Sequence, residues 1–190
     1  MTIELLIFAH LFFVACGLGC AARLDLEFFA SRKAPPSAIL LNDAEKSHRF
    51  IIFALIGLWA TGISLIYFRT GFVTEDVSAK LWMKVIVVTV LSMNSVVISK
   101  FAMPRVVKYS DLPVFAIPMR SKLPMAIVSA VSTVSWLSAL ALGAIETLKT
   151  QSWDVLLPLF GGAYGASVII AIGVCLAVRA PVGYAEQQPS

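Results

Sequence analysis

Charge is scarce in this chain, and that scarcity excludes a water-soluble globular protein. Only 14% of the 190 residues are charged, whereas 59% are hydrophobic and the mean hydropathy is +0.88. So few charged side chains cannot cover a surface that faces water. The composition therefore indicates that lipid is the main solvent of the folded chain.

Residue types that carry most enzyme chemistry are also few. The chain has three cysteines and two histidines, and it contains no zinc-ligand spacing, phosphate-binding loop, nucleophile elbow or pair of catalytic carboxylates. Cys16 and Cys20 are four residues apart, which suits a soft metal ion, but His10 lies on another helix face and further ligands would have to come from elsewhere.

Long apolar runs are what the chain has in abundance. A helix that crosses about 30 Å of hydrocarbon needs roughly 18 or more apolar residues, and lipid requires helices because each satisfies its own backbone polar groups. We therefore predict an all-α integral membrane protein, a five-transmembrane-helix bundle forming one domain over residues 1–179, with a disordered cytoplasmic tail at 180–190. The expected spans are about 3–22, 50–68, 81–101, 123–145 and 155–178.

The basic residues predict how these spans are oriented. Eleven of the fifteen follow the first, third or fifth run, and the positive-inside rule makes those ends cytoplasmic. The N-terminus is then external and the C-terminus cytoplasmic, in a bacterial inner membrane. The net charge of +4 is explained by this topology, so no nucleic-acid partner is expected. The eleven are Arg23, Arg32, Lys33, Lys46, Arg49, Lys100, Arg105, Lys108, Arg120, Lys122 and Arg179; the external four are Arg69, Lys80, Lys84 and Lys149.

The same topology predicts the redox state of the three thiols. Cys16, Cys20 and Cys175 all fall in the cytoplasmic half of the bilayer, where thiols stay reduced. No disulfide is expected.

Prolines divide the two cytoplasmic loops. The first helix is expected to continue past the membrane interface until Pro35 and Pro36, and the second to begin early with Asn42 or Asp43 as its cap. Three prolines between residues 102 and 122 exclude one continuous helix there, and the apolar residues among them predict a segment on the membrane surface.

Two further prolines help to set the starts of the last two helices. Pro124 is expected to open the fourth helix and Pro158 to fall in the first turn of the fifth, where a missing amide donor does little harm.

Small and polar residues predict helix contacts. Small residues spaced four apart predict close packing of the fourth and fifth helices, with a contact between protomers as the alternative. They are Gly161 and Gly165 in the fifth helix and Ser135, Ala139 and Gly143 in the fourth. 

The side-chain amide of Asn94 is expected at mid-membrane, where it needs a hydrogen-bond partner. Asn94 is expected to bond to the backbone of another helix, or to a serine such as Ser129 or Ser132.

His10 is the centre of the first candidate site. It lies about two turns, roughly 10 Å, below the external surface, and Gly17 lies seven residues on, where a side-chain-free patch would accept a macrocycle. Alternatively, His10 is hydrogen-bonded between helices, for instance to a serine. His48 lies at the opposite membrane face, too far away to share one haem iron.

Lys84 is the centre of the second candidate site. Its amine either extends to the external interface or pairs with Glu4, Glu146 or Asp154 beside Arg69. Such a cluster would receive an anion or pass protons.

Five short motifs occur in order in about the first hundred residues: Ala9-His10-Leu11, Ala22-Arg23-Leu24, Glu45-Lys46-Ser47-His48-Arg49, Thr61-Gly62 and Leu81-Trp82-Met83-Lys84. In this order they resemble the haem-containing membrane protoporphyrinogen oxidases of bacteria (the HemJ type). The resemblance implies a helical bundle with His10 as ligand of haem b, Lys84 and Arg23 at functional positions, and a porphyrin-linked oxidation. Where that family has a further histidine in its third helix, this chain has Asn94.

Three functional hypotheses result. The first is a haem-associated or redox-linked membrane protein, with His10, Gly17, Lys84 and Arg23 binding the cofactor and His10 the iron. The second is a carrier of a small solute or ion that uses Lys84, Arg69 and Glu146. The third is a non-catalytic accessory subunit, with a membrane protein or a second copy of the chain as partner.

Overall fold

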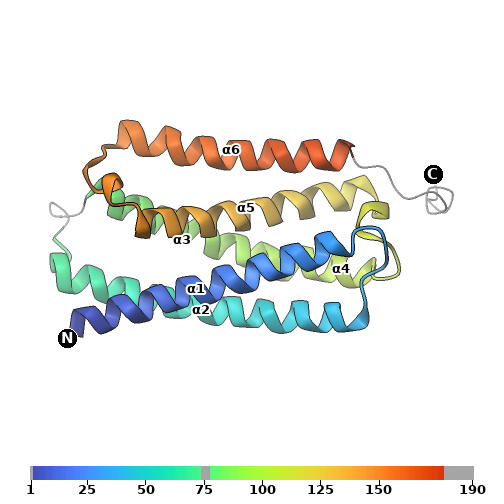
Figure 1. Cartoon of the computed structure of the whole chain (residues 1–190), viewed down its shortest axis with the longest axis horizontal. Helices are drawn as coiled ribbons and strands as arrows, with labels where there is room; N and C mark the ends of the chain where they lie inside the picture. Colours follow the sequence, from blue (N-terminus) through green and yellow to red (C-terminus); the bar gives the residue numbers. More distant parts are fainter. Residues whose placement is uncertain (1, 74–77, 178–190) are drawn as a thin grey trace.

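Five long helices form an antiparallel bundle, as predicted (Figure 1). The computed structural model describes residues 2–73 and 78–177, so the expected tail at 180–190 lies outside the described residues. All five helices are long and apolar enough to cross a membrane. They are α1 (Thr2–Ala30), α2 (Ala38–Thr70), α3 (Ala79–Val97) with its continuation, α5 (Met119–Ala144) and α6 (Trp153–Ala177).

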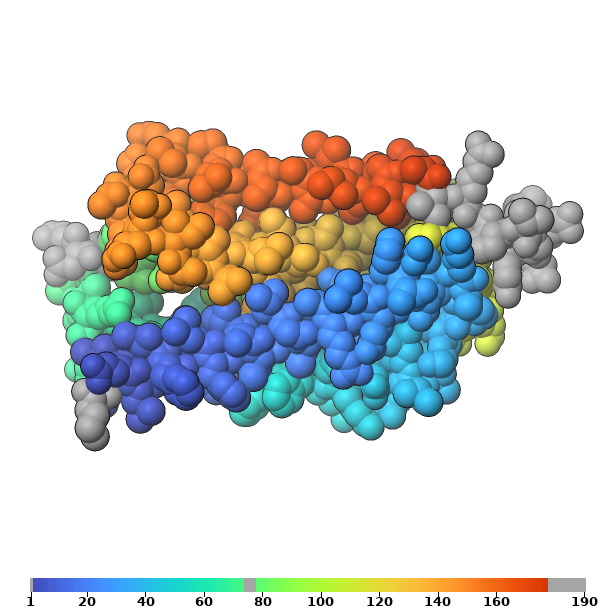
Figure 2. All heavy atoms as spheres, in the orientation of Figure 1, coloured from blue at the N-terminus to red at the C-terminus, as the bar shows by residue number. Residues whose placement is uncertain are grey.

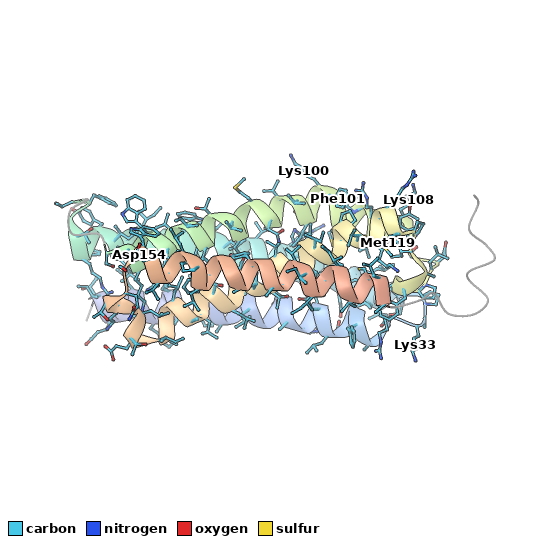
Figure 3. The ribbon with its side chains drawn as sticks, turned by 90° about the horizontal axis from the view of Figure 1, so that it is seen from above. Lys33, Lys100, Phe101, Lys108, Met119 and Asp154 are labelled. Atoms are coloured by element: carbon cyan, nitrogen blue, oxygen red, sulfur yellow. The ribbon has the colours of Figure 1, made fainter. Side chains whose placement is uncertain are left out.

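The bundle has two ends, which we name after one residue near each. The His10 end holds the starts of α1, α3 and α6 and the ends of α2 and α5, and the Arg23 end lies opposite. In Figure 3, Asp154 lies at the His10 end, whereas Lys33 and Lys108 lie at the Arg23 end.

The first loop is shorter than its polar composition suggests. Helix α1 continues to Ala30, which confirms that it passes the predicted interface. Helix α2 begins directly after the two prolines, where the Ser37 hydroxyl accepts a hydrogen bond from the Leu40 amide at 3.1 Å. The prediction of Asn42 or Asp43 as cap is wrong, because Ser37 meets the chain first and is a good capping residue.

The second loop is also more helical than predicted. Helix α3 passes through a π-helical turn (Ile98–Ala102) into α4 (Met103–Lys108), and Pro104 lies in the first turn of α4. A short 3₁₀ turn (Val114–Ala116) follows, in which the Phe115 amide donates to the Arg32 carbonyl. Ala116 and Ile117 of this segment are buried against the bundle, whereas Val107 is 61% exposed; its place on the membrane surface stays a prediction.

Both late prolines lie inside their helices. Pro124 is the sixth residue of α5 and Pro158 the sixth of α6, so Pro124 does not open its helix and Pro158 falls in the second turn. The expected starts were too late because each helix begins in polar or aromatic residues ahead of its apolar run.

The core has its centre at Trp136 of α5, whose side chain is completely buried. Its indole lies against Gly17 of α1, where a β-carbon would overlap the ring. Leu58 and Leu91 bring α2 and α3 into the same cluster. Many large apolar side chains face outward instead, such as Phe8 at 68% exposure, as helices in lipid require.

Helices α5 and α6 pack together, but not through the predicted glycines. A β-carbon at Gly143, Gly161 or Gly165 would meet nothing within 4 Å. The contact uses larger residues spaced four apart on α6, among which Phe160 is buried and the Tyr164 hydroxyl lies 2.7 Å from Ser135 Oγ. The predicted packing of these two helices is confirmed, and two of the predicted small residues take part: Ser135 meets Tyr164, and Ala139 packs against the cluster that contains Phe160. The three glycines were assigned to the wrong face, because their spacing does not tell which helix face meets the neighbour.

The mid-membrane amide has the partner that was expected. Asn94 Nδ2 donates to the Val128 carbonyl of α5 at 3.0 Å. The backbone bond predicted for Asn94 is therefore confirmed.

We predict that Gly17→Ala destabilises the bundle by about 1–3 kcal/mol, because the added methyl group overlaps a ring that cannot move. Gly19→Ala is the matched control: a β-carbon there meets nothing within 4 Å, and stability should stay equal or rise by up to about 1 kcal/mol. Thermal unfolding in detergent measures both. Equal Tm values for the two variants would contradict the close contact of Gly17 with Trp136.

Candidate functional site

A cavity of about 850 Å³ lies inside the bundle at its His10 end. We call it the His10 cavity; α1, α2, α3 and α5 line it, together with Lys149 of the 3₁₀ turn Glu146–Thr150. Its volume is within the range of small-molecule sites, about 300–1,000 Å³. Figure 2 shows a gap between the first half of α1 and the end of α5, on this half of the molecule.

His10 lines this cavity from α1 and is held there by α2. Its Nδ1 lies 2.8 Å from Thr61 Oγ1, and the Thr61 hydroxyl donates its hydrogen to the Gly57 carbonyl at 2.7 Å. The hydroxyl oxygen must therefore accept from Nδ1–H, which fixes the tautomer. Nε2 then carries a lone pair, and no residue in the described ranges binds it.

This bond agrees with the interpretation of His10 as a residue bonded between helices, with a threonine in place of the expected serine. It also creates the arrangement typical of ligating histidines, in which one ring nitrogen is held and the other is free. Gly62 of α2 lies beside the ring, because a β-carbon there would be in van der Waals contact with His10 Cε1, at 3.4 Å.

Gly17 does not contribute an open patch below His10. The Trp136 indole covers it, and the residue does not line the cavity. The expected side-chain-free surface at Gly17 is therefore wrong, because a residue of another helix fills the space that the glycine leaves.

Four cations line the cavity, and none of its described lining residues is acidic: they are Arg69, Lys80, Lys84 and Lys149. Lys80 donates to the Ile145 carbonyl at 2.7 Å, and Lys149 is paired with Glu146 at 2.7 Å. Lys84 is half-buried, and within residues 2–73 and 78–177 nothing forms a hydrogen bond or ion pair with its amine. The cavity is therefore positively charged at its polar end.

The expected cluster of cations is present, but its carboxylate partner is different. Glu146 lies beside Lys149 rather than Lys84, and that hydrogen bond lowers the pKa of the Glu146 carboxyl. Asp154 does not line the cavity and lies 3.5 Å from the Ser152 hydroxyl.

Arg23 lies far from His10. Thirteen residues separate them on α1, which is about 20 Å along the helix. Its guanidinium binds Glu27 at 2.7 Å and Asp43 at 2.9 Å, joining α1 to α2 at the Arg23 end. His10 and Arg23 therefore do not meet in one site.

His48 belongs to the other half of the bundle too. Its Nε2 lies 2.6 Å from Ser99 Oγ in the π-helical turn. Along α2, His48 precedes Gly62 by fourteen residues, which is about 21 Å. The two histidines are thus separated, as their positions in the chain predict.

Several cavity residues were not found from the sequence. Thr61 entered only within a motif, although its hydroxyl orients His10. Trp59, which is deep for an interfacial anchor, donates through Nε1 to Ser92 Oγ at 3.0 Å and forms a wall between α2 and α3. The position of Thr61, four residues after Gly57, predicts only that its hydroxyl can bond to the Gly57 carbonyl of its own helix. It does not tell which residue of another helix the hydroxyl will meet.

A bare metal ion finds few ligands in the described part of the chain. Among residues 2–73 and 78–177, no three His, Cys, Asp or Glu side chains gather closely enough to hold one. Cys16 and Cys20 have no such third partner there, so His10 is the donor that the cavity offers.

We predict that Lys84→Met increases stability by about 1 kcal/mol, because it removes a half-buried cation that Lys80, Arg69 and Lys149 repel. Lys108→Met, which removes an exposed cation at the Arg23 end, should change stability little. Thermal unfolding in a neutral detergent compares the two. A Lys84→Met variant less stable than Lys108→Met would contradict the picture of an uncompensated charge.

Comparison with protein-family models, with curated proteins and with solved structures finds no match to this chain. Its fold and its class as a multi-pass membrane protein therefore rest on its own five apolar helices.

Proposed function

We propose that this multi-pass membrane protein binds a tetrapyrrole in the His10 cavity and acts as a haem-associated or redox-linked protein of the bacterial inner membrane. The observation that carries the proposal is the state of His10. Its Nδ1 is held by Thr61, no residue that the structure describes binds its Nε2, and it lines the same cavity as Lys84 and Arg69.

The lining residues suit both parts of such a ligand. Apolar side chains such as Leu11, Leu58 and Val88 match a macrocycle, and the cations match its carboxylates. Arginine is well suited to carboxylates because its donors bind both oxygens at once.

His10 Nε2 would hold the iron of haem b, and Thr61 would keep the ring oriented. Lys84 and Arg69 would bind the acidic groups, and Val14 and Leu58, which line the cavity and pack in the Trp136 cluster, would exclude water from below. When bound, the haem would supply redox chemistry at its iron, and the enzyme class implied by the resemblance is a porphyrin-linked oxidoreductase. Asn94 does not line the cavity and its amide binds Val128, so the lining residues in the described ranges offer one histidine to hold the group.

The alternative is a carrier of a small anion. It is favoured by Lys84 and Arg69, which line the same cavity. Transport also needs a route to the Arg23 end, and the buried side chains of Trp136, Leu58 and Leu91 fill the bundle between. Anion uptake into vesicles that Lys84→Met abolishes would favour the carrier.

We predict that protein purified from haem-replete cells shows a Soret absorption band and that His10→Ala abolishes it. His48→Ala is the matched control, because it removes the other histidine of the chain and should keep the band. Thr61→Val should weaken haem affinity about 10–100-fold through loss of the Nδ1 acceptor. A colourless wild-type protein, or equal spectra for the two alanine variants, would contradict the proposal.

The orientation of the bundle is part of the proposal, with the His10 end external. In a variant with Cys16, Cys20 and Cys175 replaced by alanine, Lys149→Cys should react with a membrane-impermeant maleimide in intact cells. Lys108→Cys should react only after permeabilisation, because the positive-inside rule makes the Arg23 end cytoplasmic. The reverse pattern of labelling would overturn the sidedness.

A further inference from the structure

The His10 cavity reaches the surface of the bundle between two helices, and the residues at that surface are apolar. Leu11 of α1 and Leu140 of α5 line the cavity and are also 50% and 42% exposed. Gly143 and Ala144 of α5 likewise line it and are exposed. We call these four residues the lateral opening.

The opening exists because α1 and α5 touch only part of the way along. They are held together where the Trp136 indole lies against Gly17. Toward the His10 end they separate, and Figure 2 shows the gap between the first half of α1 and the end of α5. Small residues on α5 widen it: Ala139, Gly143 and Ala144 all line the cavity, and a β-carbon at Gly143 would meet nothing within 4 Å.

The opposite wall is different. The residues of α3 that line the cavity, such as Leu81, Lys84 and Val85, are not exposed. On α2, Ile63 lines the cavity and is 47% exposed, but the gap that Figure 2 shows in the surface lies between α1 and α5, and the lining residues at that gap are apolar.

We infer that the ligand of the His10 cavity enters sideways from the bilayer, through the lateral opening between α1 and α5; this rests on the proposed function. The ligand class is then narrower than a tetrapyrrole in general: a membrane-dissolved, anionic amphiphile whose apolar body passes Leu11 and Leu140. Its acidic groups meet Lys84 and Arg69 at the polar end, which gives the entering molecule a fixed orientation.

The test closes the opening after the protein has folded. In the variant without native cysteines, Gly143→Cys is reconstituted in vesicles and reacted with benzyl methanethiosulfonate, whose ring then occupies the opening. Gly173→Cys of α6 is the matched control, because a β-carbon there also meets nothing within 4 Å, yet Gly173 does not line the cavity. Protoporphyrin IX is supplied in a second set of vesicles, and binding is followed by quenching of tryptophan emission, to which Trp59 in the cavity wall contributes.

Benzylated Gly143→Cys should load at least ~10-fold more slowly than the unreacted variant, because the narrowed opening must move before the ligand passes. Reductant should restore the rate, and benzylated Gly173→Cys should load normally. Equal rates for both benzylated variants would overturn the lateral route and leave the proposed site intact, with entry from the His10 end. Absence of loading in the unmodified protein would instead contradict the site, and the route with it.

Discussion

The contact between Gly17 and Trp136 is the constraint on which the rest of the structure depends. It fixes α1 against α5 at one level of the bundle, and the two helices separate from there toward the His10 end. Trp136 is completely buried in the same cluster as Val14 and Leu58, which both line the cavity. The contact of this ring with Gly17 therefore fixes the core against which the inner part of the cavity is built.

Lipid imposes a second condition, which separates the polar groups that link helices from those of the proposed binding site. Polar groups buried in an apolar environment need partners, and most here have them across helices. Asn94 binds the Val128 carbonyl, and Asp25 of α1 accepts hydrogen bonds from Ser129 and Thr133 of α5, both at 2.7 Å. These bonds make Asn94 and Asp25 structural links between helices. Ser95 Oγ and Trp136 Nε1 are buried without a hydrogen-bond partner in the described residues, but neither residue lines the His10 cavity.

His10 and Lys84 differ from those links, because each keeps a group without a partner in the described residues. Nε2 of His10 and the ammonium of Lys84 face one cavity, beside Arg69. An unpaired acceptor and an unpaired cation at membrane depth are costly, and their presence in one space is explained by a ligand that binds both. The cost in stability is the physical reason to assign binding to this place and structure to the rest.

Sequence patterns predicted which segments cross the membrane, and left open how the segments face each other. Apolar length alone located all five spans, and the need of Asn94 for a partner was met as expected. The errors concern which face of a helix meets its neighbour. The Trp136 indole covers Gly17, and a β-carbon at Gly161 would meet nothing within 4 Å. Both errors arise because the spacing of small residues is the same whichever helix lies opposite. Thr61 escaped notice for that reason too, since its role exists only once α1 and α2 lie side by side.

The asymmetry of the bundle bears on the kind of function. A carrier must expose its site alternately to both sides of the membrane, which usually requires two related halves around a central site. Here the cavity lies at one end, the buried core around Trp136 fills the bundle beyond it, and the four cations that line the cavity all lie at the His10 end. A ligand that enters such a cavity leaves by the way it came. The geometry therefore favours binding or chemistry at a fixed site over passage through the bundle.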